Sequence, residues 1–243
     1  MTVMYKHLFF DLDNTIWDFD LNSYHALREV YDQYGLPAGE YEQFNEVYNR
    51  NNDRLWELYR KHEITKADLA ASRFSLSFDE LGIKGIDWAE FNHDYLERMP
   101  HQTRLCAGAR ELLDHLSPWF TMHIITNGFV EVQHKKLANS NLAKYFTHVF
   151  ISEELKSPKP APEIYHHALK TSNARKKESL MIGDSWDVDI IGAMNVGIDQ
   201  VHFVHTGGST GFTEAEQTQV IQSPTRTWRF NQLADIAGIL RKY

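Results

Sequence analysis

The chain of 243 residues contains a single cysteine, Cys106, no apolar run longer than a strand and no run of basic residues longer than three. One cysteine cannot form a disulfide within the chain, and we expect Cys106 to be structural. The apolar runs fall far short of the roughly 18 residues that a membrane helix needs. The 25 Lys and Arg are scattered and the net charge is -8, which disfavours a nucleic-acid polymer as partner. We therefore expect a cytoplasmic protein without a membrane span.

The apolar residues that are present suffice for a folded core. Hydrophobic residues make up 42% of the chain and charged residues 24%, as is typical of globular domains. Five short apolar runs predict buried strands at residues 7–10, 122–125, 148–151, 180–182 and 201–204. Helical patterns separate the last four runs, for example at 131–142 and 162–169. This alternation predicts an α/β fold with a doubly wound, Rossmann-like parallel sheet.

The long segment between the first and second predicted strands has apolar residues at helical spacing. We expect helices there at residues 21–34, 41–61, 66–81 and 88–98. Glycines, a proline and the expected N-cap Thr65 mark the breaks between them. The sequence therefore predicts a helical domain at 17–103, inserted into an α/β core formed by 1–16 and 104–243.

Acidic residues follow two of the predicted strands. Asp11 and Asp13 come directly after the first, and Asp184 follows the fourth, with Asp187 and Asp189 close behind. In a parallel sheet, the residues after the strands lie at one edge, where ligands bind. Two carboxylates about 4 Å apart repel each other by about 4 kcal/mol at an effective dielectric constant near 20, so a cation is needed. Oxygen ligands without His or Cys favour Mg²⁺ over zinc.

Groups suited to a phosphate lie on other predicted loops. Lys159 stands between prolines that stiffen the backbone, and it would face an anion held at the acidic edge. Thr126 and Asn127 end the second predicted strand just before a helix, whose N-terminus attracts anions. A small-molecule phosphate ester is therefore the expected substrate.

Each of these residues also has an ordinary structural interpretation. Asp11 and Asp13 could cap turns or helices, Thr126 could stabilise a strand end, and Lys159 could be a solvated surface residue. Asp187 is more often a turn or cap residue than a metal ligand. The Gly-rich stretch 207–211 matches no phosphate-binding motif and is read as a connector.

The order of these motifs resembles the haloacid dehalogenase-like hydrolase superfamily over almost the whole chain. The matching segments are Asp11-Leu12-Asp13-Asn14-Thr15, Thr126-Asn127-Gly128, Lys159-Pro160, and Gly183-Asp184-Ser185 followed by Asp189. The helical segment resembles the cap domain that many members insert after the first motif. The residues around the motifs look like the bacterial branch that includes pyrimidine 5′-nucleotidases.

The resemblance implies a role for each motif residue. Asp11 would be the nucleophile that forms an aspartyl-phosphate, and Asp13 would be the general acid and base. Mg²⁺ would be bound by Asp11, the backbone carbonyl of Asp13, Asp184 and a further acidic residue, for which we favour Asp189 over Asp187. Thr126, Asn127 and Lys159 would bind the phosphate group.

The resemblance also implies which reaction to expect. Relatives that release halide lack the second aspartate of the first motif, so Asp13 favours phosphoryl transfer. We expect a nucleoside 5′-monophosphate phosphatase. The alternatives are a sugar-phosphate or phosphoglycolate phosphatase, then a phosphomutase, a haloacid dehalogenase or a binding protein without catalysis. The oligomeric state stays open.

Overall fold

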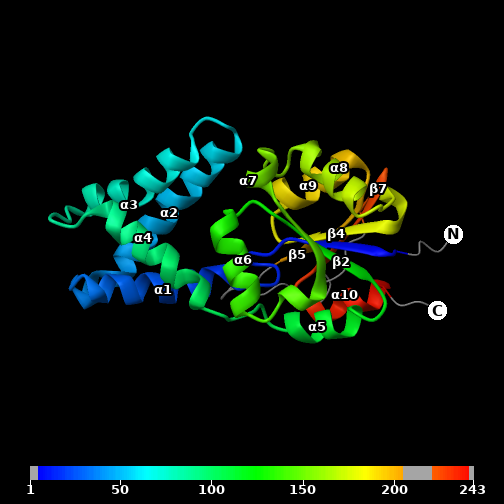
Figure 1. Cartoon of the computed structure of the whole chain (residues 1–243), viewed down its shortest axis with the longest axis horizontal. Coiled ribbons are helices and arrows are strands. Elements are labelled where there is room, and N and C mark those ends of the chain that lie inside the picture. Colours follow the sequence, from blue (N-terminus) through cyan, green and yellow to red (C-terminus); the bar gives the residue numbers. More distant parts are fainter. Residues whose placement is uncertain (1–4, 205–220, 241–243) are drawn as a thin grey trace. The chain divides into compact units, whose positions relative to one another are not determined.

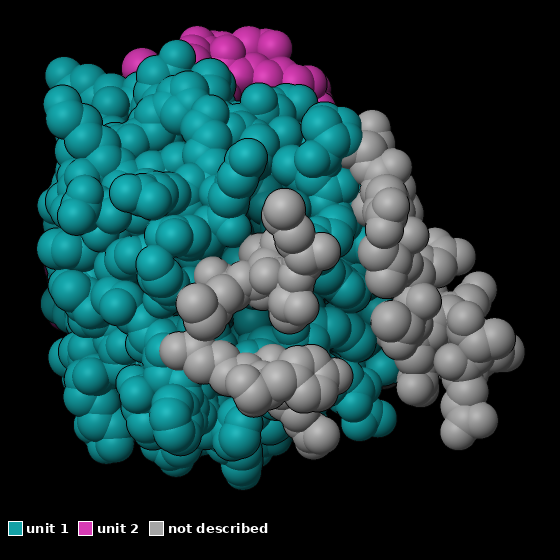
Figure 2. Space-filling view, turned by 90° about the vertical axis from the view of Figure 1, so that its right-hand side faces the viewer, with its two compact units in different colours: residues 1–20, 103–243 teal, residues 21–102 magenta. Residues whose placement is uncertain are grey.

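The structure is a computed structural model that describes residues 5–204 and 221–240. The chain divides into two compact units, Met1–Asp20 with Thr103–Tyr243, and Leu21–Gln102. Figure 2 colours them teal and magenta. The predicted connector at 207–211 lies outside the described residues.

The first unit is built on a single seven-stranded sheet (Figure 1). From one edge to the other, its strands are β3 (Phe146–Ile151), β2 (Thr121–Thr126), β1 (His7–Phe10), β4 (Ser179–Gly183), β5 (Asp199–Phe203), β7 (Thr225–Phe230) and β6 (Ile221–Ser223). Neighbouring strands run parallel except at the β6/β7 edge. β1 starts at the middle of the sheet and the chain then winds outward in both directions. The predicted doubly wound, Rossmann-like α/β class is confirmed.

Helices cover both faces of this sheet. α8 (Pro162–Thr171) and α9 (Ile191–Val196) lie on one face, and α5 (Ala109–Leu116) and α10 (Leu233–Leu240) lie on the other (Figure 1). The apolar core under α8 and α9 draws side chains from four strands, including Phe9, Ile125, Phe150 and Met181. Burial on both faces explains why these strands are continuous apolar runs in the sequence.

The second unit is helical. Its elements are α1 (Phe19–Gln33), α2 (Tyr41–Arg60), α3 (Lys66–Leu81) and α4 (Trp88–Arg98). α3 begins with a capping box between Thr65 and Asp68 and ends at Gly82, whose φ is 67°. The Asp87 carboxylate caps α4 by accepting from the backbone amides of Ala89 and Glu90. A helical unit is thus inserted after β1, as the sequence analysis predicted.

Residues 17–20 and Thr103 group with the first unit in the structure, although the sequence analysis assigned them to the insertion. Trp17 is buried and forms isolated bridges with Asp13 and Leu105, and its indole N–H donates to the Ser140 hydroxyl at 3.2 Å. Trp17 therefore packs within the first unit, and the inserted unit begins after it along the chain. The sequence analysis also missed β7, whose alternating Thr-Arg-Thr-Trp-Arg-Phe sequence has no continuous apolar run. Among the described residues, no helix is long and apolar enough to cross a membrane.

Three histidines stack across neighbouring strands of the sheet. His123 on β2 lies between His7 on β1 and His148 on β3, with ring centroids 5.5 and 5.4 Å from theirs. His123 is fully buried, and burial together with its two histidine neighbours lowers its pKa to about 3. The folded chain therefore keeps this ring neutral at pH values where an exposed histidine takes up a proton.

We predict that His123 makes the protein less stable in mild acid. Below pH 6.5 the unfolded chain binds a proton at this residue, whereas the folded chain binds none until about pH 3, so stability falls as the pH is lowered through this range. The free energy of unfolding should be about 1 to 2 kcal/mol lower at pH 5 than at pH 7.5 because of this residue. Urea unfolding at pH 7.5 and pH 5 should show a smaller difference for His123→Phe than for the wild type. Equal differences would contradict this account.

Candidate active site

Three carboxylates meet at the carboxyl ends of β1 and β4. β1 pairs with β4, with Phe10 opposite Ile182, so the residues that follow, Asp11 and Asp184, leave adjacent strands. Asp189 comes from the short π-helical segment Trp186–Ile190 after β4. Carboxylate oxygens of Asp11, Asp184 and Asp189 all lie within 4.8 Å of one another. We call these three residues the acidic cluster.

The local backbone explains why Asp189 rather than Asp187 joins the cluster. Asp189 is buried, and its Oδ2 accepts from the backbone N–H of Ser185 at 3.1 Å. A Cβ atom on Gly183 would lie 2.4 Å from the Asp189 carboxyl group, so only glycine leaves room for this side chain. Asp187 is exposed and lies outside the cluster. The preference for Asp189 thus agrees with the geometry, although its role stays a prediction.

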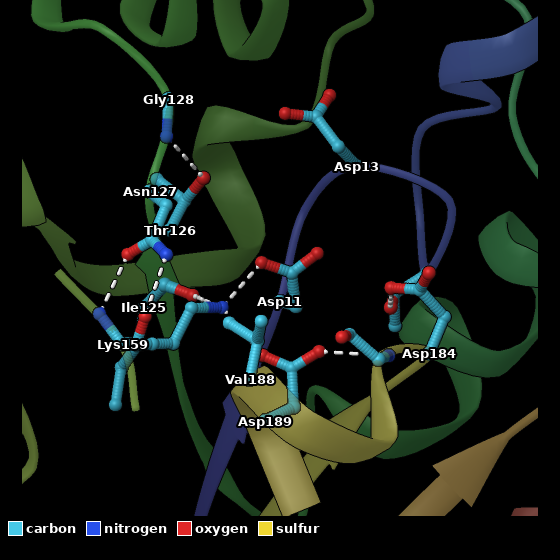
Figure 3. A network of polar contacts seen from close by, with 12 residues as sticks. Asp11, Asp13, Ile125, Thr126, Asn127, Gly128, Lys159, Asp184, Val188 and Asp189 are labelled. Carbon is cyan, nitrogen blue, oxygen red and sulfur yellow. Dashed lines mark hydrogen bonds and ion pairs between the residues drawn. The ribbon is translucent and has the colours of Figure 1, made fainter. Parts of the chain in front are cut away.

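Lys159 lies at the centre of the site (Figure 3). Its ammonium group donates to Asp11 Oδ1 at 2.5 Å, to Asp189 Oδ1 at 2.6 Å and to the Ile125 carbonyl at 2.7 Å. The side chain is almost fully buried. The ion pairs between Lys159 and the two buried carboxylates replace the hydrogen bonds to water that each charged group loses on burial.

The side chain of Asn127 fixes the loop that carries Lys159. Its amide oxygen accepts from the backbone N–H of Lys159 at 2.8 Å, and its amide nitrogen donates to the Lys159 carbonyl at 3.0 Å. The sequence analysis expected Asn127 to bind phosphate, whereas both of its side-chain groups here bind the protein backbone. The positive end of α6 (Val130–Asn139) begins just beyond it.

Asp13 lies apart from the acidic cluster, and its carboxylate is turned away from Asp11 (Figure 3). Two residues of α6 bind it: Lys136 donates to Oδ1 at 2.6 Å, and Gln133 donates to Oδ2 at 2.9 Å. Gln133 also donates to the hydroxyl of Thr126 at 2.7 Å. The sequence analysis missed both residues, although their spacing of three places them on one face of a predicted helix.

Burial and mutual repulsion shift the charges of the acidic cluster. Burial raises the pKa of Asp11 to about 7, because the attraction of Lys159 does not fully offset desolvation. Burial and the repulsion of Asp11 and Asp189 raise the pKa of Asp184 well above its usual value. Burial alone would lower the pKa of Lys159, but the attraction of the two carboxylates outweighs it and raises that pKa. The single positive charge of Lys159 is therefore too small to stabilise the ionised form of all three carboxyl groups.

The donor set of the cluster fits a hard divalent cation. Three carboxylates supply only oxygen atoms, and no His or Cys is part of the group. The Asp184 carboxylate is oriented by the Thr15 hydroxyl, which donates to it at 3.1 Å. Mg²⁺ prefers such ligands together with water, and its charge would favour the ionised form of all three carboxyl groups.

Sequence comparison places the chain in a family. The model of the haloacid dehalogenase-like hydrolase family matches residues 8–203. The chain therefore belongs to the haloacid dehalogenase-like hydrolases and is an enzyme of the hydrolase class.

Particular relatives extend this comparison. The chain is 34% identical to pyrimidine 5′-nucleotidase PynA of Streptococcus pneumoniae, over 83% of this chain and 84% of that protein. It is 30% identical to a glyceraldehyde 3-phosphate phosphatase of Pyrococcus abyssi, over 82% of each chain. Among solved structures, HAD-hydrolase YfnB of Bacillus subtilis, bound to magnesium, superimposes with a TM-score of 0.84 at 26% identity, over 98% of this chain and 99% of that one.

We predict that removing the Lys159 ammonium group severely destabilises the protein in the absence of divalent ions. Lys159→Met leaves Asp11 and Asp189 buried without a positive partner, which should lower the free energy of unfolding by about 3 to 5 kcal/mol. Urea unfolding in EDTA measures this loss. Lys170→Met, at an exposed position on α8, is the control and should change stability by less than about 0.5 kcal/mol. A loss for Lys159→Met as small as that of the control would show that the ion pairs contribute little.

Proposed function

We propose that the protein is a Mg²⁺-dependent phosphomonoester hydrolase that acts through an aspartyl-phosphate, with nucleoside 5′-monophosphates, especially those of pyrimidines, as substrates. The observation that carries this proposal is the position of Asp11. Asp11 belongs to the acidic cluster, contacts Lys159 and lies two residues before Asp13, whose carboxylate is bound by Lys136 and Gln133.

The first step transfers the phosphoryl group to Asp11. A carboxylate oxygen of Asp11 forms a bond to phosphorus while the ester P–O bond breaks. Asp13 gives a proton to the departing oxygen, which leaves as an alcohol. Lys159 keeps one oxygen of Asp11 fixed at 2.5 Å, so the other oxygen is the one that attacks.

The second step releases phosphate. Asp13, now a carboxylate, takes a proton from a water molecule, and the oxygen of that water bonds to phosphorus as the bond between phosphorus and Asp11 breaks. Inorganic phosphate leaves and both aspartates return to their starting states. The hydroxyl of Thr126 and the positive end of α6 are suited to bind the phosphate oxygens. The three N–H groups of Lys159 bind Asp11, Asp189 and the Ile125 carbonyl, so Lys159 would attract the phosphate through its positive charge.

Asp11, Asp184, Asp189 and the backbone carbonyl of Asp13 would hold the Mg²⁺ ion. When bound, the ion would offset the repulsion between Asp11 and the phosphate dianion and stabilise charge on the transferring group. The donor chemistry of the cluster and the magnesium bound in the structure of YfnB support this assignment.

The inserted helical unit, Leu21–Gln102 in the structure, would serve as the cap that selects the leaving group. The similarity to PynA supports a pyrimidine nucleotide as substrate. The similarity to the P. abyssi phosphatase makes a three-carbon sugar phosphate the second candidate. Both candidates require the same chemistry at Asp11 and differ only in what the cap must accommodate.

A panel of phosphate esters tests the proposal. With Mg²⁺ present, we expect turnover of UMP, dUMP and dTMP with kcat/KM at least about tenfold above that for glyceraldehyde 3-phosphate or phosphoglycolate, and no turnover in EDTA. Asp11→Asn should lower kcat at least about 1,000-fold, because an amide cannot form the covalent intermediate.

The outcomes separate the parts of the proposal. Turnover of sugar phosphates without nucleotides would remove the nucleotidase assignment and keep the mechanism. Retained activity in a folded Asp11→Asn variant would overturn the covalent route. If no ester of the panel is hydrolysed, the phosphatase assignment itself is wrong.

A further inference from the structure

The loop that carries Asp13 is fastened to helix α6 at successive points. Lys136 and Gln133 each bind one oxygen of the Asp13 carboxylate. The ammonium group of Lys136 also lies 4.2 Å from the centre of the Trp17 ring and 5.2 Å from that of Phe19, both within cation–π range. The Trp17 indole N–H then donates to the Ser140 hydroxyl at the end of α6. Lys136 therefore contacts the loop both at its start, through Asp13, and at its end, through the rings of Trp17 and Phe19.

Space is reserved for the Gln133 side chain. A Cβ atom on Gly128 would lie 2.3 Å from Gln133 Cδ, so a larger residue at position 128 would displace the glutamine. The glutamine nitrogen joins Asp13 to the Thr126 hydroxyl, at 2.9 and 2.7 Å. A single side chain therefore links the residue proposed for proton transfer with the residue proposed to bind phosphate.

Stability alone is a weak reason for these polar contacts. Lys136 has only 2% of its side chain exposed, and burying an ammonium group is costly. Apolar residues of similar size often replace buried ion pairs without loss of stability. The Asp13 side chain is 27% exposed, so it is accessible from solvent while α6 binds both of its carboxylate oxygens.

We infer that Lys136, assisted by Gln133, is a positioning residue that fixes the direction of the Asp13 carboxylate for proton transfer to the leaving group. This inference rests on the proposed function. Both carboxylate oxygens are tied to one rigid helix, so the carboxylate cannot rotate freely about its side-chain bonds. Proton transfer requires a heavy-atom approach of about 2.6 to 3.2 Å, and a carboxylate with free rotation would meet this requirement only part of the time.

The leaving group gives a readout that a merely structural role would not affect. The nucleoside leaving group of UMP is a poor one and needs a proton, whereas the nitrophenolate of p-nitrophenyl phosphate leaves without one. The ratio kcat/KM reports the step in which the ester bond breaks, free of the later release of phosphate. Lys136→Met should lower kcat/KM about 100-fold for UMP and less than about fivefold for p-nitrophenyl phosphate.

Two further variants complete the test. Lys136→Arg keeps a cation beside Asp13 and the two rings, and should recover most of the UMP activity. Lys135→Met removes the neighbouring exposed lysine of α6 and should leave both esters unaffected. If circular dichroism shows that Lys136→Met does not fold, Gln133→Leu takes its place and should lower the ratio of UMP to nitrophenyl activity in the same direction, by a smaller factor.

Each remaining outcome overturns the inference. Equal losses on the two esters would make Lys136 structural. No change, or a gain that favours UMP, would show that Asp13 needs no such support, as would an unchanged ratio in a folded Gln133→Leu variant. Failure of the wild type to hydrolyse either ester would instead remove the proposed function, and with it this inference.

Discussion

The site depends on the charge balance around one buried ammonium group. Lys159 lies between Asp11 and Asp189 with its donors directed at their oxygens, and Asp184 lies beside them. Three carboxylates and one amine leave a net negative charge in a place from which water is largely excluded. Desolvation and repulsion then raise the pKa values of Asp11 and Asp184. A divalent cation is the simplest group that corrects this imbalance and keeps Asp11 ionised for attack.

The parallel sheet makes this crowding possible. Asp11 and Lys159 are separated by 148 positions in the chain, yet β1 and β3, which lie on either side of β2, end at the same edge of the sheet, and the segments that follow them bring the two residues together. Small residues let side chains approach closely: Gly183 leaves room for Asp189, and Gly128 leaves room for Gln133. Rigid secondary structure thus holds repelling groups together, as is common at catalytic sites.

Much of this arrangement could be predicted from the sequence, because strands buried on both faces are continuous apolar runs and polar residues follow them directly. The sequence therefore indicated that Asp11, Asp184, Asp189 and Lys159 would converge. α3 was predictable to the residue, since its Thr65 cap and Gly82 stop are local signals. Strand β7, which pairs with β5 and with the edge strand β6, was not, because its alternating pattern is short and a single sequence does not show which strands pair.

The partners of Asp13 were also beyond sequence reasoning. Lys136 on a polar helix reads as a surface lysine until the structure shows it buried against Trp17 and Asp13. The double hydrogen bond from Asn127 to the Lys159 backbone likewise depends on how two separate loops meet. Side-chain contacts between elements are set by tertiary packing, for which a single sequence gives no direct signal.

Calorimetric titration of Mg²⁺ into the protein tests the central claim most directly. The account predicts one site per chain in the wild type, affinity at least about 100-fold weaker in Asp184→Asn, and unchanged affinity in Asp187→Asn, three residues further along. Equal binding by the wild type and Asp184→Asn, or no binding by the wild type, would contradict it.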